Sequence, residues 1–117
     1  MSGCVKFWKK QNSIQAIANR INKAIAKEVK HVSVEKTWVF HYGAIDINPK
    51  HLVYWICVKS DKEKRRLSNE TNIRDDLRNL LEKYNYPLES REAVIIAIES
   101  EETVERESKG NWWQHFK

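Results

Sequence analysis

The sequence predicts a small α+β protein in which two helices pack on one face of a three- or four-stranded, mostly antiparallel sheet. Apolar residues recur every three or four positions in two segments and every second position in another, which gives the order α-β-β-α-β(-β). The 117 residues, 41% hydrophobic and 32% charged, suit one folded domain. We therefore treat residues 1–117 as a single α+β domain, since two helices on one sheet face bury both apolar stripes economically.

The first segment, up to about residue 30, has the helical period. Asn12 or Ser13 is a suitable N-cap, so the segment is either one long helix or a short helix followed by a longer one. The residues that form its apolar stripe are Phe7, Ile14, Ile17, Ala18, Ile21, Ala24, Ile25 and Val29.

From residue 32 to residue 42 the apolar period changes to two, which indicates a strand. Its predicted apolar face comprises Val32, Val34, Trp38, Phe40 and Tyr42. Asn48 and Pro49 form a turn signal, so we expect the chain to reverse between residues 43 and 50. Residues 52–59 are apolar on both faces, which is typical of a central strand.

The second half is predicted as a loop, a helix, a strand and an aromatic tail. Residues 60–66 are read as a solvated charged loop, and residues 73–84 as the second helix, ended by Tyr86 and Pro87. Residues 93–98 resemble a buried strand, and residues 100–103 begin one or two helical turns. Residues 112–116 form either an edge strand or a tail packed on the body.

Several classes of protein do not fit the composition. No apolar run approaches the roughly 18–20 residues that cross a bilayer, and Arg20, Lys23 and Lys27 interrupt any apolar leader. The only cysteines, Cys4 and Cys57, lack CxxC spacing and are read as free thiols of a reducing compartment. The sequence therefore favours a cytoplasmic location with no membrane partner.

The residues that commonly carry catalysis or metals do not form a known motif. His41 and His51 flank the predicted turn, but no HxxxH or CxxC pair fixes a first pair of metal ligands. Cys57 lies mid-strand among apolar neighbours, where a thiol is usually packing. The acidic run is read as a solvated face and comprises Glu99, Glu101, Glu102, Glu105 and Glu107. We therefore predict no catalytic residue, no metal and no cofactor.

One short pattern resembles the PD-(D/E)xK nucleases in order and spacing. Asp46 is followed by a strand that ends in Cys57, Val58 and Lys59, where that family has an acid, any residue and a lysine. The resemblance implies a divalent ion that activates water, but Cys57 occupies the position of the second acid. A degenerate nuclease-like domain is therefore an alternative function, and it requires Asp46 and Lys59 close together at one sheet edge.

The net charge of +5 divides unevenly along the chain: residues 1–66 carry +9 and residues 67–117 carry −4. A basic cluster precedes the second helix, and the first helix is also rich in lysine. Such clusters neutralise phosphates, so a nucleic-acid-binding module is a second alternative. The basic cluster comprises Lys59, Lys62, Lys64, Arg65 and Arg66.

Five tryptophans in so short a chain are the other unusual feature. Val53, Trp55 and Cys57, with Val39, are predicted to form a second apolar sheet face. This face is either exposed for a partner or covered by the C-terminal aromatic residues. A homodimer through this face or an edge strand would satisfy the same pattern.

These observations favour a small non-enzymatic protein that acts through protein–protein interaction. By analogy only, single domains of this size that lack a catalytic motif include inhibitors and immunity proteins. The predicted binding residues are Trp38, Trp55, Lys64, Arg65, Arg66, Glu101, Glu102, Glu105, Trp112 and Trp113.

Overall fold

The computed structural model describes residues 13–116, so Phe7 and the predicted start of the first helix before residue 13 lie outside it. The helices are α2 (Ile14–Val32), α3 (Asp61–Ser68), α4 (Thr71–Lys83), α5 (Glu101–Ser108) and α6 (Trp112–His115). The strands are β1 (Trp38–Tyr42), β2 (Val53–Val58) and β3 (Ile95–Ser100), and two 3-10 turns are η1 (Pro49–His51) and η2 (Leu88–Ala93). Among the described residues, no helix is both long and apolar enough to cross a membrane.

The sheet has the strand order β1-β2-β3, so the prediction that residues 52–59 form the central strand is confirmed. β1 pairs with β2 in antiparallel, and β3 pairs with β2 in parallel. The sheet is therefore mixed, which differs from the mostly antiparallel sheet that was predicted. Because two helices, α3 and α4, connect β2 to β3, the chain returns to the same end of the sheet before β3 begins.

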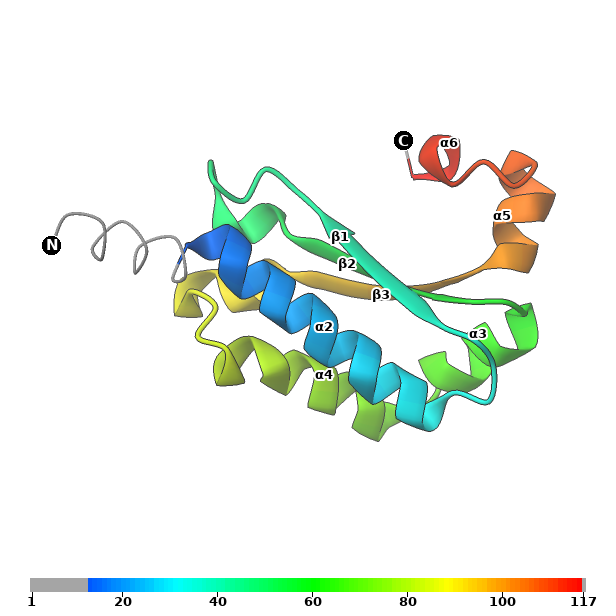
Figure 1. Ribbon diagram of the computed structural model, residues 1–117, viewed down its shortest axis with the longest axis horizontal. Coiled ribbons are helices and arrows are strands. Elements are labelled where there is room, and N and C mark those ends of the chain that lie inside the picture. The colour runs from blue at the N-terminus through cyan, green and yellow to red at the C-terminus, as the bar shows by residue number, and fades with distance from the viewer. Residues whose placement is uncertain (1–12, 117) are drawn as a thin grey trace, which may run out of the picture.

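The predicted pair of helices on one sheet face is confirmed in α2 and α4, which lie side by side (Figure 1). Ser13 caps α2, since its Oγ accepts a hydrogen bond from the Ala16 amide at 3.2 Å. Ile21 and Ile25 of α2 are fully buried against the sheet face that carries Tyr54, Ile56 and Val58. We call this side of the sheet the helix-covered face.

The prediction of a solvated loop at residues 60–66 is wrong, because these residues begin helix α3. Ser60 is the N-cap, and its Oγ accepts a hydrogen bond from the Glu63 amide at 3.1 Å. Asp61 and Glu63 lie in the first turn, where carboxylates complement the helix dipole. The high density of charged residues led to the prediction of a loop, although a serine followed by two acidic residues is also typical of the start of a helix.

The strand predicted from residue 32 begins later than expected. Val32 is the last residue of α2, and Val34 lies in the connection with 83% of its surface exposed. The predicted reversal after β1 is confirmed. Gly43 lies at this reversal with a φ of +135°, and a Cβ at this position would lie 2.2 Å from the His51 carbonyl oxygen.

The C-terminal segment forms two short helices beyond β3 rather than an edge strand. Ser100 caps α5, so the predicted helical turns after residue 100 are confirmed. Lys109 and Gly110, both with positive φ, turn the chain, and Asn111 Oδ1 caps α6 through the Gln114 amide at 3.0 Å. α6 thereby returns toward the sheet on the side away from α2 (Figure 1).

Candidate functional site

The strand register gathers the sheet's large aromatic side chains on one face. Trp38 pairs with Cys57, and Phe40 pairs with Trp55, so these residues point away from the helix-covered face. We call this side the aromatic face. Val39, predicted beside Trp55, instead pairs with Ile56 and packs against the main core. Trp38 and Trp55, either of which was expected on the binding face, therefore share one face of the sheet.

Helix α6 covers part of the aromatic face. The Phe116 ring lies 4.5 Å from the Trp55 ring and 5.5 Å from the Phe40 ring, measured between centroids. The Trp112 ring meets the Trp38 ring edge-on at 5.5 Å. Cys57 is fully buried on this face. The C-terminal aromatic residues therefore cover one part of this face and leave another part exposed, so each of the two predicted alternatives applies to a part of it.

Burial raises the pKa of the Cys57 thiol to about 12, and the nearby carboxylates of Glu99 and Glu101 act in the same direction. A thiol with such a pKa carries almost no thiolate at neutral pH. Its role is therefore packing, as the strand pattern predicted.

The uncovered part of the aromatic face is a groove of about 600 Å³. Tyr42 is 43% exposed and Trp113 is 79% exposed. The Trp55 indole nitrogen donates a hydrogen bond to the Tyr42 hydroxyl at 3.0 Å, which orients the Tyr42 ring. We call this feature the aromatic groove, and its lining residues are Trp38, Phe40, Tyr42, Trp112, Trp113 and Phe116.

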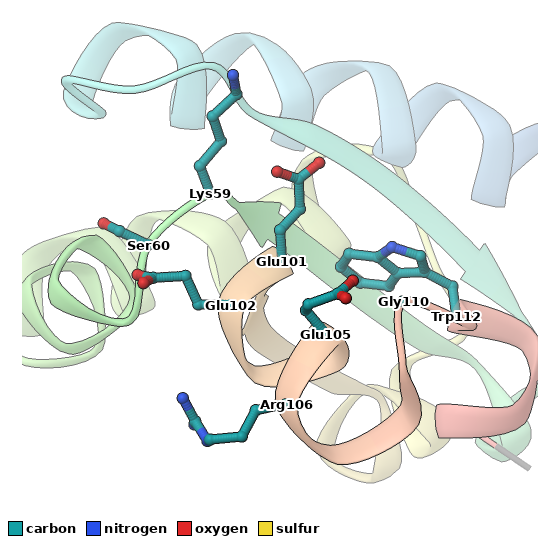
Figure 2. Close-up of a pocket in the computed structure, with 8 residues that line it drawn as sticks. All are labelled: Lys59, Ser60, Glu101, Glu102, Glu105, Arg106, Gly110 and Trp112. Atoms are coloured by element: carbon teal, nitrogen blue, oxygen red, sulfur yellow. The ribbon is translucent and has the colours of Figure 1, made fainter.

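A second cavity, of about 860 Å³, lies at the carboxyl ends of β2 and β3, where α3 and α5 begin. Trp112 lines both this cavity and the aromatic groove. Figure 2 shows the Glu101 and Glu105 side chains on the same side of α5 as the Trp112 ring, with Arg106 directed away from them. We call it the acidic cavity, lined by Lys59, Ser60, Glu101, Glu102, Glu105, Arg106, Gly110 and Trp112.

Part of the charge around the acidic cavity is already neutralised. Arg106 Nη1 donates to Asp61 Oδ2 at 2.8 Å, and Glu102 Oε1 accepts from the Asp61 amide at 2.7 Å. Hydrogen bonds from Ser100, Thr103 and Arg106 hold the pKa of the Asp61 carboxyl well below its usual range.

Glu101 and Glu105 differ from these residues, because neither side-chain carboxylate makes a hydrogen bond or ion pair within residues 13–116. Both are exposed, and they lie one helical turn apart on α5. The cavity therefore presents two unpaired carboxylates beside an indole ring.

Helix α6 is anchored to the sheet through the buried carboxylate of Glu99. His115 Nε2 lies 2.8 Å from Glu99 Oε2, and Lys64 Nζ donates to Glu99 Oε1 at 2.7 Å. Burial opposes the ionisation of Glu99, but the hydrogen bonds from Lys64 and His115 outweigh it and lower the pKa of this carboxyl. Glu99 thus ties α3, β3 and α6 together.

Ser108 Oγ lies 2.9 Å from His115 Nδ1, which completes a serine–histidine–carboxylate chain. Such a chain resembles the arrangement of a nucleophile, a base and an orienting acid. However, Ser108 lines neither the groove nor the acidic cavity. It is also the last residue of α5, and the negative end of a helix dipole opposes an oxyanion. We therefore assign this chain of hydrogen bonds to the anchoring of α6.

The structure brings together six of the ten predicted binding residues: Trp38, Glu101, Glu102, Glu105, Trp112 and Trp113. Trp55 lies against Phe116 instead of lining the groove. Lys64 pairs with Glu99, while Arg65 is exposed on α3. Arg66 donates to Glu63 and to the Val32 carbonyl oxygen.

The sequence prediction missed Phe40, Tyr42 and Phe116 as lining residues of the groove. The signal for the first two was present, because they alternate with Trp38 along β1. Phe116 follows Trp112 by four positions, which puts both rings on one side of a helical turn.

The nuclease-like arrangement is contradicted by the positions of its two key residues. Asp46 accepts a hydrogen bond from Gln15 before β2 begins, whereas Lys59 follows the end of β2. A six-residue strand separates them, about 20 Å at the usual rise per residue. They form no common site.

The two histidines that flank the turn do not meet either. His41 Nδ1 lies 2.8 Å from Asn22 Oδ1, and burial lowers the pKa of this imidazole. His51 is exposed in η1. Within residues 13–116 no cluster of three potential metal ligands occurs.

No family model matches the sequence, no curated protein matches it, and no solved structure matches the chain. The function is therefore argued from the groove, the cavity and their charges.

Proposed function

We propose that this is a non-enzymatic binding protein that acts through protein–protein interaction, with the aromatic groove as its main contact surface. The observation that carries the proposal is an open groove of about 600 Å³ lined by six aromatic side chains. Tryptophan and tyrosine are enriched at the energetic centres of protein interfaces, and apolar patches on small proteins mark interaction sites. The likeness in kind to inhibitors and immunity proteins remains an analogy.

The groove lies between β1 and α6, which are both held in place, so we expect a partner to bind in the groove rather than the groove to close. Its floor belongs to β1, which pairs along its whole length with the central strand. One wall is α6, anchored through Glu99 and His115. A surface that is already ordered loses little conformational entropy when a partner docks.

The nucleic-acid alternative has less support from the arrangement of charge. Lys64 and Arg66 are engaged in ion pairs, while Lys62 and Arg65 on α3 and Lys59 before it remain exposed. Base stacking on a groove requires cations beside the rings to hold the backbone. The aromatic groove instead adjoins the unpaired carboxylate of Glu105, which repels phosphate.

A displayed random-peptide library screened on the purified protein tests the proposal. We expect enriched peptides whose binding is lost in Trp113→Ser. Leu88→Ser is the matched control, because Leu88 is a comparably exposed apolar side chain in η2, outside the groove. The proposal fails if no enriched peptide depends on Trp113 while DNA or RNA is retained tightly and in a salt-sensitive manner.

A further inference from the structure

The aromatic groove and the acidic cavity are joined through one side chain. The Trp112 ring contacts Trp38, Phe40 and Phe116 on the groove side, and the same side chain also lines the acidic cavity. Figure 2 shows the Glu105 carboxylate beside this ring. A partner that fills the groove therefore brings its neighbouring residues against the carboxylates of α5.

The chain geometry keeps the carboxylate of Glu105 close to the turn before α6. Gly110 has φ +79, and a Cβ at this position would lie 2.7 Å from Glu105 Oε2. Glycine thus provides the left-handed turn and the space for the carboxylate at once. The Glu105 carboxylate therefore lies at the turn between α5 and α6, beside the Trp112 end of the groove.

The local charge is negative although the whole chain carries +5. Arg106 is compensated by Asp61, and Lys64 by Glu99, whereas Glu101 and Glu105 are unpaired within residues 13–116. The Lys59 side chain also lines the cavity and is unpaired within the same residues, but Figure 2 shows it directed away from Trp112. Charges more than about 8 Å apart are largely screened at physiological salt. A ligand at Trp112 therefore experiences mainly the two carboxylates.

Resting on the proposed function, we infer that the occupant of the aromatic groove is a segment of a partner protein with an arginine or lysine close to a large apolar side chain. The apolar side chain fills the groove, and the cation enters the acidic cavity against Trp112. Carboxylates form charge-assisted hydrogen bonds with such cations, and an indole face attracts them. The two anchors lie close in the partner because both cavities share Trp112.

Three pools of short, fluorescently labelled synthetic peptides test this inference. Every peptide carries one leucine, phenylalanine or tryptophan among serine and glycine. A few positions away it carries arginine in the first pool, glutamine in the second and glutamate in the third. We expect the arginine pool to bind about tenfold more tightly than the glutamine pool, and the glutamate pool to bind most weakly.

The double variant Glu101→Gln and Glu105→Gln is expected to lose the preference for arginine but to keep the binding of the glutamine pool. The control is Glu89→Gln with Glu92→Gln, which removes the same charge from exposed positions in η2, at the opposite end of β3 from α5. Circular dichroism checks that each variant is folded. Trp113→Ser is expected to weaken all three pools.

Failure of this inference and failure of the proposed function give different results in these experiments. Equal binding of the arginine and glutamine pools, still lost in Trp113→Ser, overturns the inference and leaves the proposed function standing. An arginine preference that survives Glu101→Gln with Glu105→Gln also overturns it. Self-association in light scattering that Trp113→Ser abolishes shows that a second copy occupies the groove. No binding by any pool, with no groove-dependent peptide from the library, removes the proposed function as well.

Discussion

The two faces of this sheet are both apolar, but they are covered by very different amounts of structure. The helix-covered face packs against α2 and α4, of 19 and 13 residues, and Tyr54, Ile56 and Val58 are fully or almost fully buried there. The aromatic face is covered by the four-residue helix α6, which leaves a groove. The difference indicates that the first face supplies most of the stability of the fold, and it leaves the second face open for the binding that we propose.

The largest expected effect tests the helix-covered face. Ile56→Ala removes a side chain that is 1% exposed and packs in the main core, so it leaves a cavity. We expect the free energy of unfolding to fall by about 3 kcal/mol, measured by urea denaturation. A loss no greater than that of an exposed-groove variant such as Trp113→Ser would contradict the division between the two faces.

The sequence was most informative about the helix-covered face. The stripe of Ile21 and Ile25 and the alternation of Tyr54 and Ile56 are local periodicities, and both correspond to observed burial. α3 was missed because Leu67 is its only buried apolar residue, so no stripe marks it. The parallel pairing of β3 depends on how the chain crosses the sheet, which no local pattern determines.

The second test weakens the anchor of the aromatic face. Glu99→Gln places an amide where Lys64 and His115 both meet a carboxylate oxygen, so one of them loses its acceptor. We expect a loss of about 2 kcal/mol in the free energy of unfolding. Glu101→Gln, two residues on and exposed, is the control and should have little effect.

Glu99→Gln should also expose Cys57, which is buried on the face that α6 covers. In a Cys4→Ser background, alkylation of Cys57 by iodoacetamide is expected to be about tenfold faster in Glu99→Gln, since 1.4 kcal/mol corresponds to a factor of ten. An unchanged alkylation rate together with unchanged stability would show that Glu99 does not hold α6 in place.

The third test uses acid to loosen the helix-covered side. Glu63 accepts hydrogen bonds from Arg66, Ser33 and the Val34 amide, and these lower the pKa of its carboxyl to about 2. A carboxyl whose pKa is lower in the folded state stabilises the fold fully at pH values above its unfolded-state pKa, which is near 4.5. This contribution is lost as the pH falls toward 2.

Glu63→Gln should therefore cost about 1.5 kcal/mol at pH 6, and most of this cost should be lost by about pH 2, where the carboxyl of the folded protein is half protonated. Urea denaturation of both proteins across this range measures the difference. A difference between wild type and variant that stays constant with pH would mean that the ionised form of Glu63 is not what joins α3 to the end of α2.

The site was less predictable than the core because it depends on contacts between distant segments. Covering of the second sheet face by the C-terminal aromatic residues was one of two predicted alternatives, but the partial covering was not predicted, since α6 is held by the Glu99–His115 pair, 16 residues apart. The joining of Trp38 with Trp55 on one face required the β1–β2 register, which a sequence pattern leaves open.

The smallest expected effect on stability is at the groove itself. Trp113 is 79% exposed, so Trp113→Ser should change the free energy of unfolding by no more than about 0.5 kcal/mol. The same change should abolish groove-dependent peptide binding, because the ring lines the groove. A large aromatic side chain that contributes to binding but not to folding is what the contrast between the two faces requires. If Trp113→Ser instead lowers stability by as much as Glu99→Gln, the ring belongs to the packing of α6, and the aromatic face is a second core.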